Sequence, residues 1–238
     1  MKKPTFHRSR KALAALSVLC FFAGSSAWAT VVTWNLNPSA SEGAVGSTSK
    51  TFTSSGYSIT ANGYAVGWPT HTPLGLYYKN QGGNIGLGIT STSDHELQGN
   101  GLYPTQFIQF DVSSIIDQGF TNGKLQIGSV SGSSNDTFVI WGSSKLGDAG
   151  SQIGGVYTSS SNLLFVNIAE FASYDFISIG ALSGGVLPVA FQATLAPVPE
   201  ISALFPIVGL VAAIATTQIL RRRRIAQLRA GGPSSGGH

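Results

Sequence analysis

Short runs of alternating apolar and polar residues recur through the middle of the chain. In order they are VVTWNL, YSITA, YAVGW, LGLYYKN, NIGLGIT, TQFIQFDV, KLQIGSV, TFVIWGS, LLFVNI, DFISIGA and LPVAFQATL. A period of two is typical of β-strands, whereas no long stretch places apolar residues at steps of three and four, as an amphipathic helix requires. About eleven short strands predict an all-β fold, most simply one jelly-roll-like β-sandwich over residues 30–196.

Glycine-containing dipeptides separate several of these runs. Asn62-Gly63 is the sharpest signal, because Asn-Gly tolerates the positive φ angles of a two-residue type I′ turn. It predicts a hairpin that joins YSITA to YAVGW. Asn122-Gly123 predicts a turn before KLQIGSV in the same way, and Gly82-Gly83 and Gly184-Gly185 are further predicted turns. TQFIQFDV carries apolar residues on both faces, which predicts a strand in the middle of the sandwich.

The N-terminus has the pattern of a secretory signal peptide over residues 1–29. Basic residues lead into the twelve-residue apolar run Ala12–Ala23, and Ala27 and Ala29 supply the small residues that flank a cleavage site. The run is shorter than the roughly 20 residues that a membrane-spanning helix needs. Cys20 is the only cysteine. A mature chain without it would have no disulfide, no thiol nucleophile and no cysteine ligand for zinc.

A second apolar segment lies near the C-terminus. Ile201–Leu220 contains twenty residues without a charge, and as a helix it would be about 30 Å long, the thickness of the hydrocarbon layer of a membrane. Arg221, Arg222, Arg223 and Arg224 follow directly, and arginines in this place favour the cytoplasmic side. The pattern predicts a transmembrane helix over 201–220 and a short cytoplasmic tail over 225–238. A buried core helix is the alternative.

The order of Pro199-Glu200, an apolar span and an arginine cluster resembles the sorting segment of PEP-CTERM proteins, here over residues 197–224. These are surface or secreted proteins of Gram-negative bacteria that make exopolysaccharide. The resemblance implies an exosortase-type membrane protease as partner, with cleavage near Pro199 and Glu200. It also implies anchoring in the inner membrane with the ectodomain in the periplasm, followed by release to the cell surface or matrix. Ile201 stands where a second proline is usual.

The segment GLGITSTSDHELQGNGLYPTQFIQFDVSS, residues 86–114, brings a second resemblance. It is similar to uncharacterised β-sandwich domains of PEP-CTERM proteins and loosely like galactose-binding-type sandwiches. This implies a fold and a setting, not an activity.

The formal net charge of +4 hides an uneven distribution. Five basic residues precede residue 12 and five follow residue 220, whereas residues 30–200 hold four lysines and all ten acidic residues, which is 4 − 10 = −6. An acidic region of this kind is not expected to bind nucleic acid.

Asp94-His95-Glu96 is the densest polar cluster. In an extended chain Asp94 and Glu96 point to one side, and Asp111 follows on a nearby predicted strand. Carboxylate oxygens suit calcium, so Asp94, Glu96 and Asp111 are candidate calcium ligands. The alternative is a turn in which the carboxylates accept backbone hydrogen bonds. No other cofactor is indicated.

Aromatic residues crowd between Tyr64 and Tyr78. Trp68, Tyr77 and Tyr78 are candidates for stacking on a sugar, although in a sandwich such rings more often fill the core, as we expect for Trp34 and Trp141.

Catalytic motifs are missing from the sequence. The one Gly-x-Ser-x-Gly match is at residues 232–236 in the tail, where no strand precedes it. We therefore expect a protein that is not an enzyme. The sequence predicts an exported envelope or exopolysaccharide-matrix protein with a structural or adhesive role. A carbohydrate-binding module is the first alternative, and a glycan-active enzyme is the second.

Overall fold

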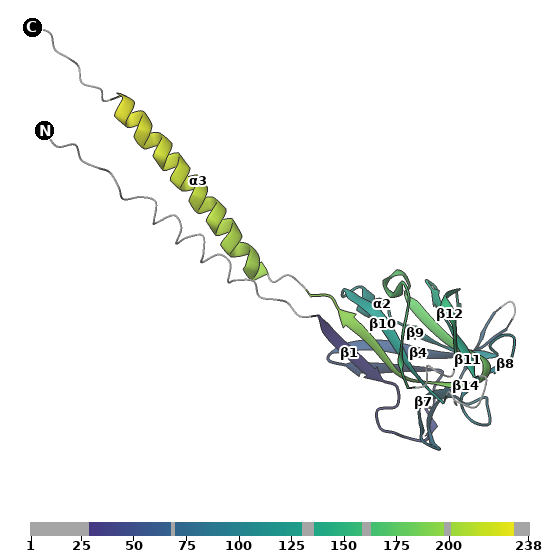
Figure 1. The fold of residues 1–238 in the computed structure, drawn as a ribbon. Coiled ribbons are helices and arrows are strands. Elements are labelled where there is room, and N and C mark those ends of the chain that lie inside the picture. Colours follow the sequence, from purple (N-terminus) through teal and green to yellow (C-terminus); the bar gives the residue numbers. More distant parts are fainter. Residues whose placement is uncertain (1–28, 68–69, 130–135, 159–162, 198–200, 231–238) are drawn as a thin grey trace, which may run out of the picture. The chain divides into compact units, whose positions relative to one another are not determined.

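The computed structural model describes residues 29–67, 70–129, 136–158, 163–197 and 201–230, and in the last range only the side chains of 208–227. Contacts within the chain separate two units. One is residues 29–196, called the β-domain below. The other comprises the two terminal parts of the chain, in which the structure describes Pro197 and one helix. Figure 1 shows the elements of both units.

The β-domain is built almost entirely from strands. They are β1 (Thr30–Asn35), β2 (Gly43–Ala44), β3 (Ser49–Ser54), β4 (Tyr57–Ala65), β5 (Thr72–Leu74), β6 (Leu76–Gln81), β7 (Asn84–Ile89), β8 (Leu97–Asn100), β9 (Gln106–Asp111), β10 (Phe120–Gly128), β11 (Thr137–Ser143), β12 (Ser151–Thr158), β13 (Phe165–Asn167) and β14 (Phe176–Leu195). Within its described residues, helical structure is limited to α2 (Ser113–Ile116) and the 3₁₀ turn η3 (Phe171–Ser173). The predicted all-β class is confirmed.

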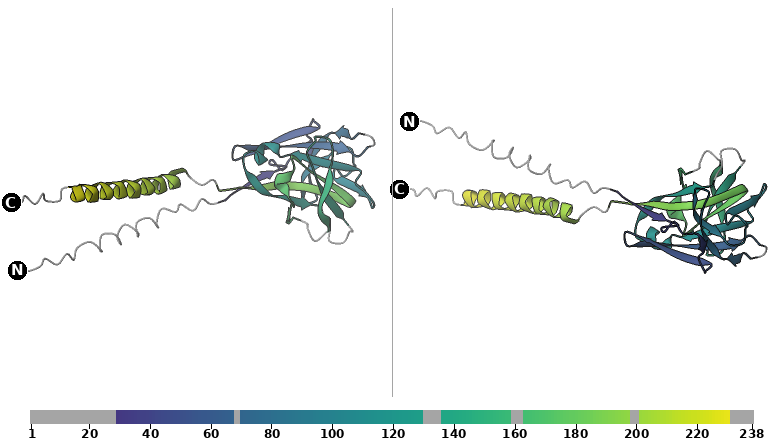
Figure 2. Two further views of the ribbon diagram at one scale, coloured as in Figure 1. Left: turned by 90° about the horizontal axis from the view of Figure 1, so that it is seen from above. Right: turned by 90° about the horizontal axis from the view of Figure 1, so that it is seen from below.

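Strand β14 organises the domain. Its first part lies between β11 and β9 in the order β12-β11-β14-β9-β4-β3, and its last part lies between β10 and β1. It therefore passes from one group of strands to another, and its light-green ribbon can be followed along the domain in Figure 2. A separate small sheet has the order β2-β6-β7. The sequence predicted two strands, DFISIGA and LPVAFQATL, where the structure has one of 20 residues.

The predicted turn at Gly184-Gly185 is consequently wrong, because both residues lie inside β14. Neighbouring side chains explain the two glycines. A Cβ atom at Gly184 would collide with the Asp136 carboxylate, and one at Gly185 would collide with the Glu96 carboxylate.

The predicted hairpin at Asn62-Gly63 is also wrong, because these residues lie inside β4. A Cβ atom at Gly63 would be 2.7 Å from the backbone oxygen of Leu74, so glycine here allows β5 to approach closely. The turn instead falls at Ser55-Gly56, with φ angles of +52° and +83°, between the paired residues Ser54 and Tyr57. Positive φ at both central positions matches a type I′ hairpin.

Two further dipeptides, Asn122-Gly123 and Gly82-Gly83, were also predicted to form turns, and only the second does so. Asn122-Gly123 does not form a turn. It lies inside β10 where the pairing register shifts, with φ of +53° at Asn122, and it forms a β-bulge. Gly82-Gly83 does form a turn, since φ angles of +62° and +86° connect β6 to β7.

The core lies between the two groups of strands that β14 joins. Phe110 on β9 meets Phe191 on β14 with ring centroids 5.5 Å apart, and Trp34 on β1 meets Phe120 on β10 at 5.9 Å. The predicted central position of β9 is confirmed, because it pairs with β4 and β14 and residues 107–110 are all buried. Trp34 is buried as expected, while Trp141 is half-buried.

The C-terminal segment forms α3 (Ile201–Ala230). The helix continues through the four arginines, whose side chains are exposed. Over the part of the chain that the structure describes, no helix combines the length and the apolar character needed to cross a membrane. The predicted transmembrane helix at 201–220 is thus not found. The stretch with described side chains, 208–227, includes Arg221–Arg224, which lower its apolar character.

Candidate functional site

A buried ion pair occupies the position at which the sequence predicted calcium ligands. Lys79 Nζ on β6 donates to Glu96 Oε1 at 2.5 Å, and the two side chains are only 8% and 7% exposed. The Ser129 hydroxyl donates to the same oxygen, and Asn84 Nδ2 donates to Ser129 Oγ at 3.0 Å. The Glu96 carboxylate is therefore occupied by groups of the domain itself.

The surroundings of this pair explain its burial. Leu76 and Lys79 on β6 are both buried, but alternation puts Leu76 on the same face as Tyr78 and Lys79 on the same face as Tyr77, the face that meets Glu96. Asn37 Nδ2 donates to the backbone oxygen of Lys79 at 3.1 Å, and the absent side chain of Gly185 leaves room for Glu96. Removing one partner of a buried pair leaves an uncompensated charge, which is strongly destabilising. The pair consequently acts as a structural contact between β6 and the segment before β8.

The other two predicted calcium ligands cap turns. Asp94 accepts hydrogen bonds from the Glu96 N–H at 3.4 Å and from Gln98 Nε2 at 2.9 Å. Asp111 accepts hydrogen bonds from the hydroxyl and the N–H of Ser113, at 2.7 and 3.1 Å. The two bonds from the N–H groups of Glu96 and Ser113 are the carboxylate-to-backbone bonds that the sequence allowed as the alternative.

Strand register keeps Asp111 apart from Asp94 and Glu96. On β14, Asp111 pairs with Phe176, whereas Leu97, the neighbour of Glu96, pairs with Val186. These positions are ten residues apart (186 − 176), up to roughly 33 Å along a straight strand. Among the described residues, no group of three or more His, Cys, Asp or Glu could hold a metal ion. The predicted convergence of Asp94, Glu96 and Asp111 is thus not observed.

Tyr77 belongs to a second polar cluster, on the same face of β6 as Lys79. Its ring stacks on His95 with centroids 3.7 Å apart, and its hydroxyl donates to Glu42 Oε1 at 2.9 Å. The Glu42 carboxylate also accepts the N–H of Asn80. The hydrogen bond to Glu42, together with some burial and the negative charge of that group, raises the pKa of Tyr77. One face of the ring is therefore already covered.

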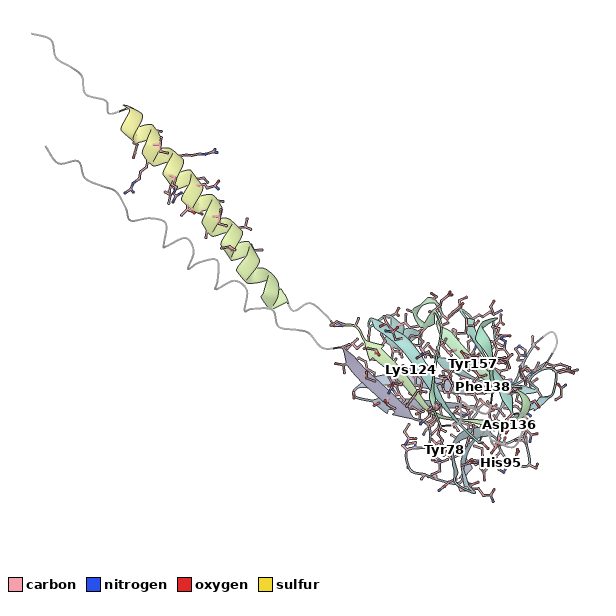
Figure 3. All side chains as sticks on the ribbon, in the orientation of Figure 1. Tyr78, His95, Lys124, Asp136, Phe138 and Tyr157 are labelled. Atoms are coloured by element: carbon pink, nitrogen blue, oxygen red, sulfur yellow. The ribbon has the colours of Figure 1, made fainter. Side chains whose placement is uncertain are left out.

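Tyr78 points to the other side of β6 and lines a groove of about 610 Å³. Figure 3 labels Tyr78 and His95. Burial raises the pKa of Tyr78. Because Tyr77 and Tyr78 face opposite ways, they do not form one stacking platform. The third predicted glycan contact, Trp68, lies outside the described residues.

The groove lies beside two strands that each pair on one side only. Its remaining lining residues are Thr33, Trp34, Asn35, Pro38, Ser39, Lys50, Thr51, Phe52, Thr53 and Ser54. Side chains alternate along a strand, so consecutive lining residues mean that the backbone edges of β1 and β3 face the groove. Sequence reasoning missed the groove, because serine and threonine in a strand carry no distinctive signal.

Three of the eight predicted sorting and processing residues fall outside the described chain. Ala27, Pro199 and Glu200 are not described, and Ala29 begins the β-domain. Arg221, Arg222, Arg223 and Arg224 form one turn of α3.

No protein-family model matches the sequence, and no curated protein matches it either.

Proposed function

We propose that this chain is an exported envelope or exopolysaccharide-matrix protein with a structural or adhesive role. In this proposal the signal peptide exports the chain, and an exosortase-type protease of the inner membrane sorts it through residues 197–224. The β-domain then works in the periplasm, at the cell surface or in the matrix. Insertion of residues 201–220 into the inner membrane, as the sequence predicts, is one part of this proposal.

The observation that carries the proposal is that several carboxylates of the β-domain form hydrogen bonds or an ion pair within the domain itself. Glu96 is paired with Lys79, Glu42 accepts from Tyr77, and Asp148 accepts the Gly150 N–H at 3.0 Å. Asp94 and Asp111 cap turns, as described above. A hydrolase needs carboxylates free to act on its substrate. Carboxylates that hold turns and strands together favour a scaffold or binding domain.

The distribution of charge supports the proposed location. The acidic surplus of residues 30–200 is flanked by basic clusters at both ends, the arrangement expected of a chain that is exported with its arginines retained inside.

The experiment is labelling of intact cells, and of spheroplasts without an outer membrane, with an amine reagent that does not cross membranes. The full-length protein is expressed in a Gram-negative host that has an exosortase-type protease. We expect labelling of Lys50 and Lys145, which are exposed on the domain. A matched variant with Arg221–Arg224 changed to serine should lose sorting while the β-domain stays folded. Labelling that requires cell lysis would contradict the proposal.

A carbohydrate-binding module that uses Trp68, Tyr77 or Tyr78 predicts a different result. On a glycan array, saturable binding that Trp68→Ala or Tyr78→Ala removes would favour that function over a purely structural one.

A further inference from the structure

A short turn lies at the end of the β-domain away from its entry and exit points. The chain enters at Thr30, which pairs with Leu195 on β14, whereas Asn100 at the end of β8 pairs with Ser183. The two positions are twelve residues apart along β14 (195 − 183). Figure 1 likewise shows β8 on the side of the domain away from β1. The turn that follows β8 is therefore distal to both ends of the domain.

Hydrogen bonds hold this turn in one conformation. Asn100 Oδ1 accepts the N–H groups of Leu102 and Tyr103, each at 3.0 Å. The Asn100 N–H donates to the Tyr103 oxygen at 3.3 Å, and the Gly101 N–H donates to the Leu182 oxygen on β14 at 2.8 Å. A side chain that accepts hydrogen bonds from two backbone N–H groups forms a stable Asx-type turn. The turn is preorganised rather than loose.

The turn presents apolar side chains to solvent. Leu102 is 83% exposed and Tyr103 is 58% exposed. The Val66 N–H donates to the Thr105 oxygen at 2.9 Å, and this bond places Val66, which is 43% exposed, beside the turn. Exposed apolar side chains that are held rigidly are typical of binding surfaces, because their ordering entropy is already lost before the ligand arrives. We call Val66, Leu102 and Tyr103 the distal tip.

The two segments that carry the distal tip hold no full charge, and the neighbouring charge, the carboxylate of Asp136 against Gly184, is negative. Residues 97–107 and the described residues of 63–74 contain no Asp, Glu, Lys or Arg. His71, the one titratable imidazole there, accepts the Gly67 N–H at its Nδ1 and packs edge-on against Phe107 at 5.0 Å. Asn100 and Thr105 supply amide and hydroxyl groups. A surface of this kind does not attract anionic lipids or acidic polymers.

We propose that the distal tip binds a neutral polysaccharide. The Tyr103 ring and the Leu102 side chain would contact the apolar C–H faces of sugar rings, and neighbouring amide and hydroxyl groups would bond to sugar hydroxyls. This inference rests on the proposed adhesive role outside the cell and names its ligand class. The tip differs from the sequence-predicted aromatic candidates, since neither Leu102 nor Tyr103 is among them.

Affinity electrophoresis of the full chain in detergent micelles tests the inference. The probes are three neutral polysaccharides, dextran, pullulan and galactomannan, and the anionic polymer alginate. We expect saturable retardation by at least one neutral probe and none by alginate. Tyr103→Ala should weaken binding about tenfold, the loss of one well-packed aromatic contact. Tyr103→Phe, which keeps the ring, should bind like the parent. Val31→Ala, a change to an exposed side chain at the other end of the domain, is the matched control.

Three results would overturn the inference. They are no retardation by any neutral probe, retardation that Tyr103→Ala leaves unchanged, and binding to phosphatidylcholine vesicles instead of polysaccharide that Leu102→Ala abolishes. Unchanged thermal midpoints would show that the variants are folded. The location of the protein is measured separately by cell labelling. Cytosolic labelling with intact polysaccharide binding would remove the proposed function alone, and surface labelling without binding would remove this inference alone.

Discussion

The Lys79–Glu96 contact and the distal tip reverse the usual placement of residue types. Lys79 and Glu96 are almost completely buried. Their charged groups bond to each other, and Ser129 donates to the Glu96 carboxylate. At the distal tip, Leu102 and Tyr103 face solvent on a rigid turn. Charged residues thus hold the fold together, while apolar ones stay exposed. Residue chemistry alone therefore does not show which groups remain available, because burial decides this.

The largest effect on stability is expected from removing the charge of one partner of the ion pair. Glu96→Gln leaves the Lys79 ammonium buried without a counter-charge, and we expect a loss of about 3–5 kcal/mol in the free energy of unfolding. Urea denaturation followed by circular dichroism measures it. The double variant Lys79→Met/Glu96→Leu removes both charges and should recover most of that loss. A double variant as unstable as the single one would contradict a paired, desolvated contact.

A smaller loss should follow from Gly88→Ala on β7. A Cβ atom there would collide with the backbone oxygen of His95, in the segment that carries Glu96. We expect a destabilisation of about 1–3 kcal/mol, the usual range for overpacking. Gly155→Ala is the control, because no atom lies within 4 Å of its Cβ position. Equal stabilities of the two variants would argue against the close approach of β7 to this segment.

Alkaline pH should affect the polar cluster around Tyr77. The pKa of Tyr77 is raised above its ordinary value of 10.0, first by its hydrogen bond to Glu42. The folded state therefore favours the protonated hydroxyl, and this contribution is complete below pH 10 and lost as the pH rises through the raised pKa. Denaturation between pH 7 and 11 should show Tyr77→Phe less stable than the parent at pH 7, with the difference closing above pH 10. A constant difference would contradict the assignment.

The smallest effect on stability is expected at the distal tip itself. Leu102→Ala and Tyr103→Ala remove mostly exposed atoms, so the free energy of unfolding should change by no more than about 0.5 kcal/mol. Thermal and urea denaturation provide the check. A larger loss would mean that the two side chains support the fold, which would remove the contrast with the buried ion pair.

Period-two alternation was sufficient to predict the all-β class and the central position of β9. Both follow from burial on one or two faces of a strand, a property that is local in the sequence. The dipeptides were less informative. Gly82-Gly83 forms the expected turn, but Asn62-Gly63 lies inside β4 because β5 approaches Gly63 too closely for a side chain. That approach is a tertiary contact, which no local pattern records.

At the candidate site, too, the features that are local in the sequence were predicted and those that depend on tertiary contacts were not. Asp94 and Asp111 cap turns through neighbours within four residues, and such capping was among the expectations. The pairing of Glu96 with Lys79 joins the segment before β8 to β6 and was not predicted. Leu102 and Tyr103 were also missed, because their exposure depends on the hydrogen bonds of Asn100 and on the bond from Gly101 to Leu182 in a remote strand.

The ladder between β1 and the end of β14 joins the first and last strands of the β-domain. Thr30 cannot pair with Leu195 before Leu195 has been synthesised. This pairing joins residues at the two ends of the domain sequence and therefore has a large cost in loop-closure entropy. During synthesis the ladder is incomplete until residue 195 has emerged. The domain therefore cannot complete its sheet until its whole sequence is available, whichever part of the sheet forms first.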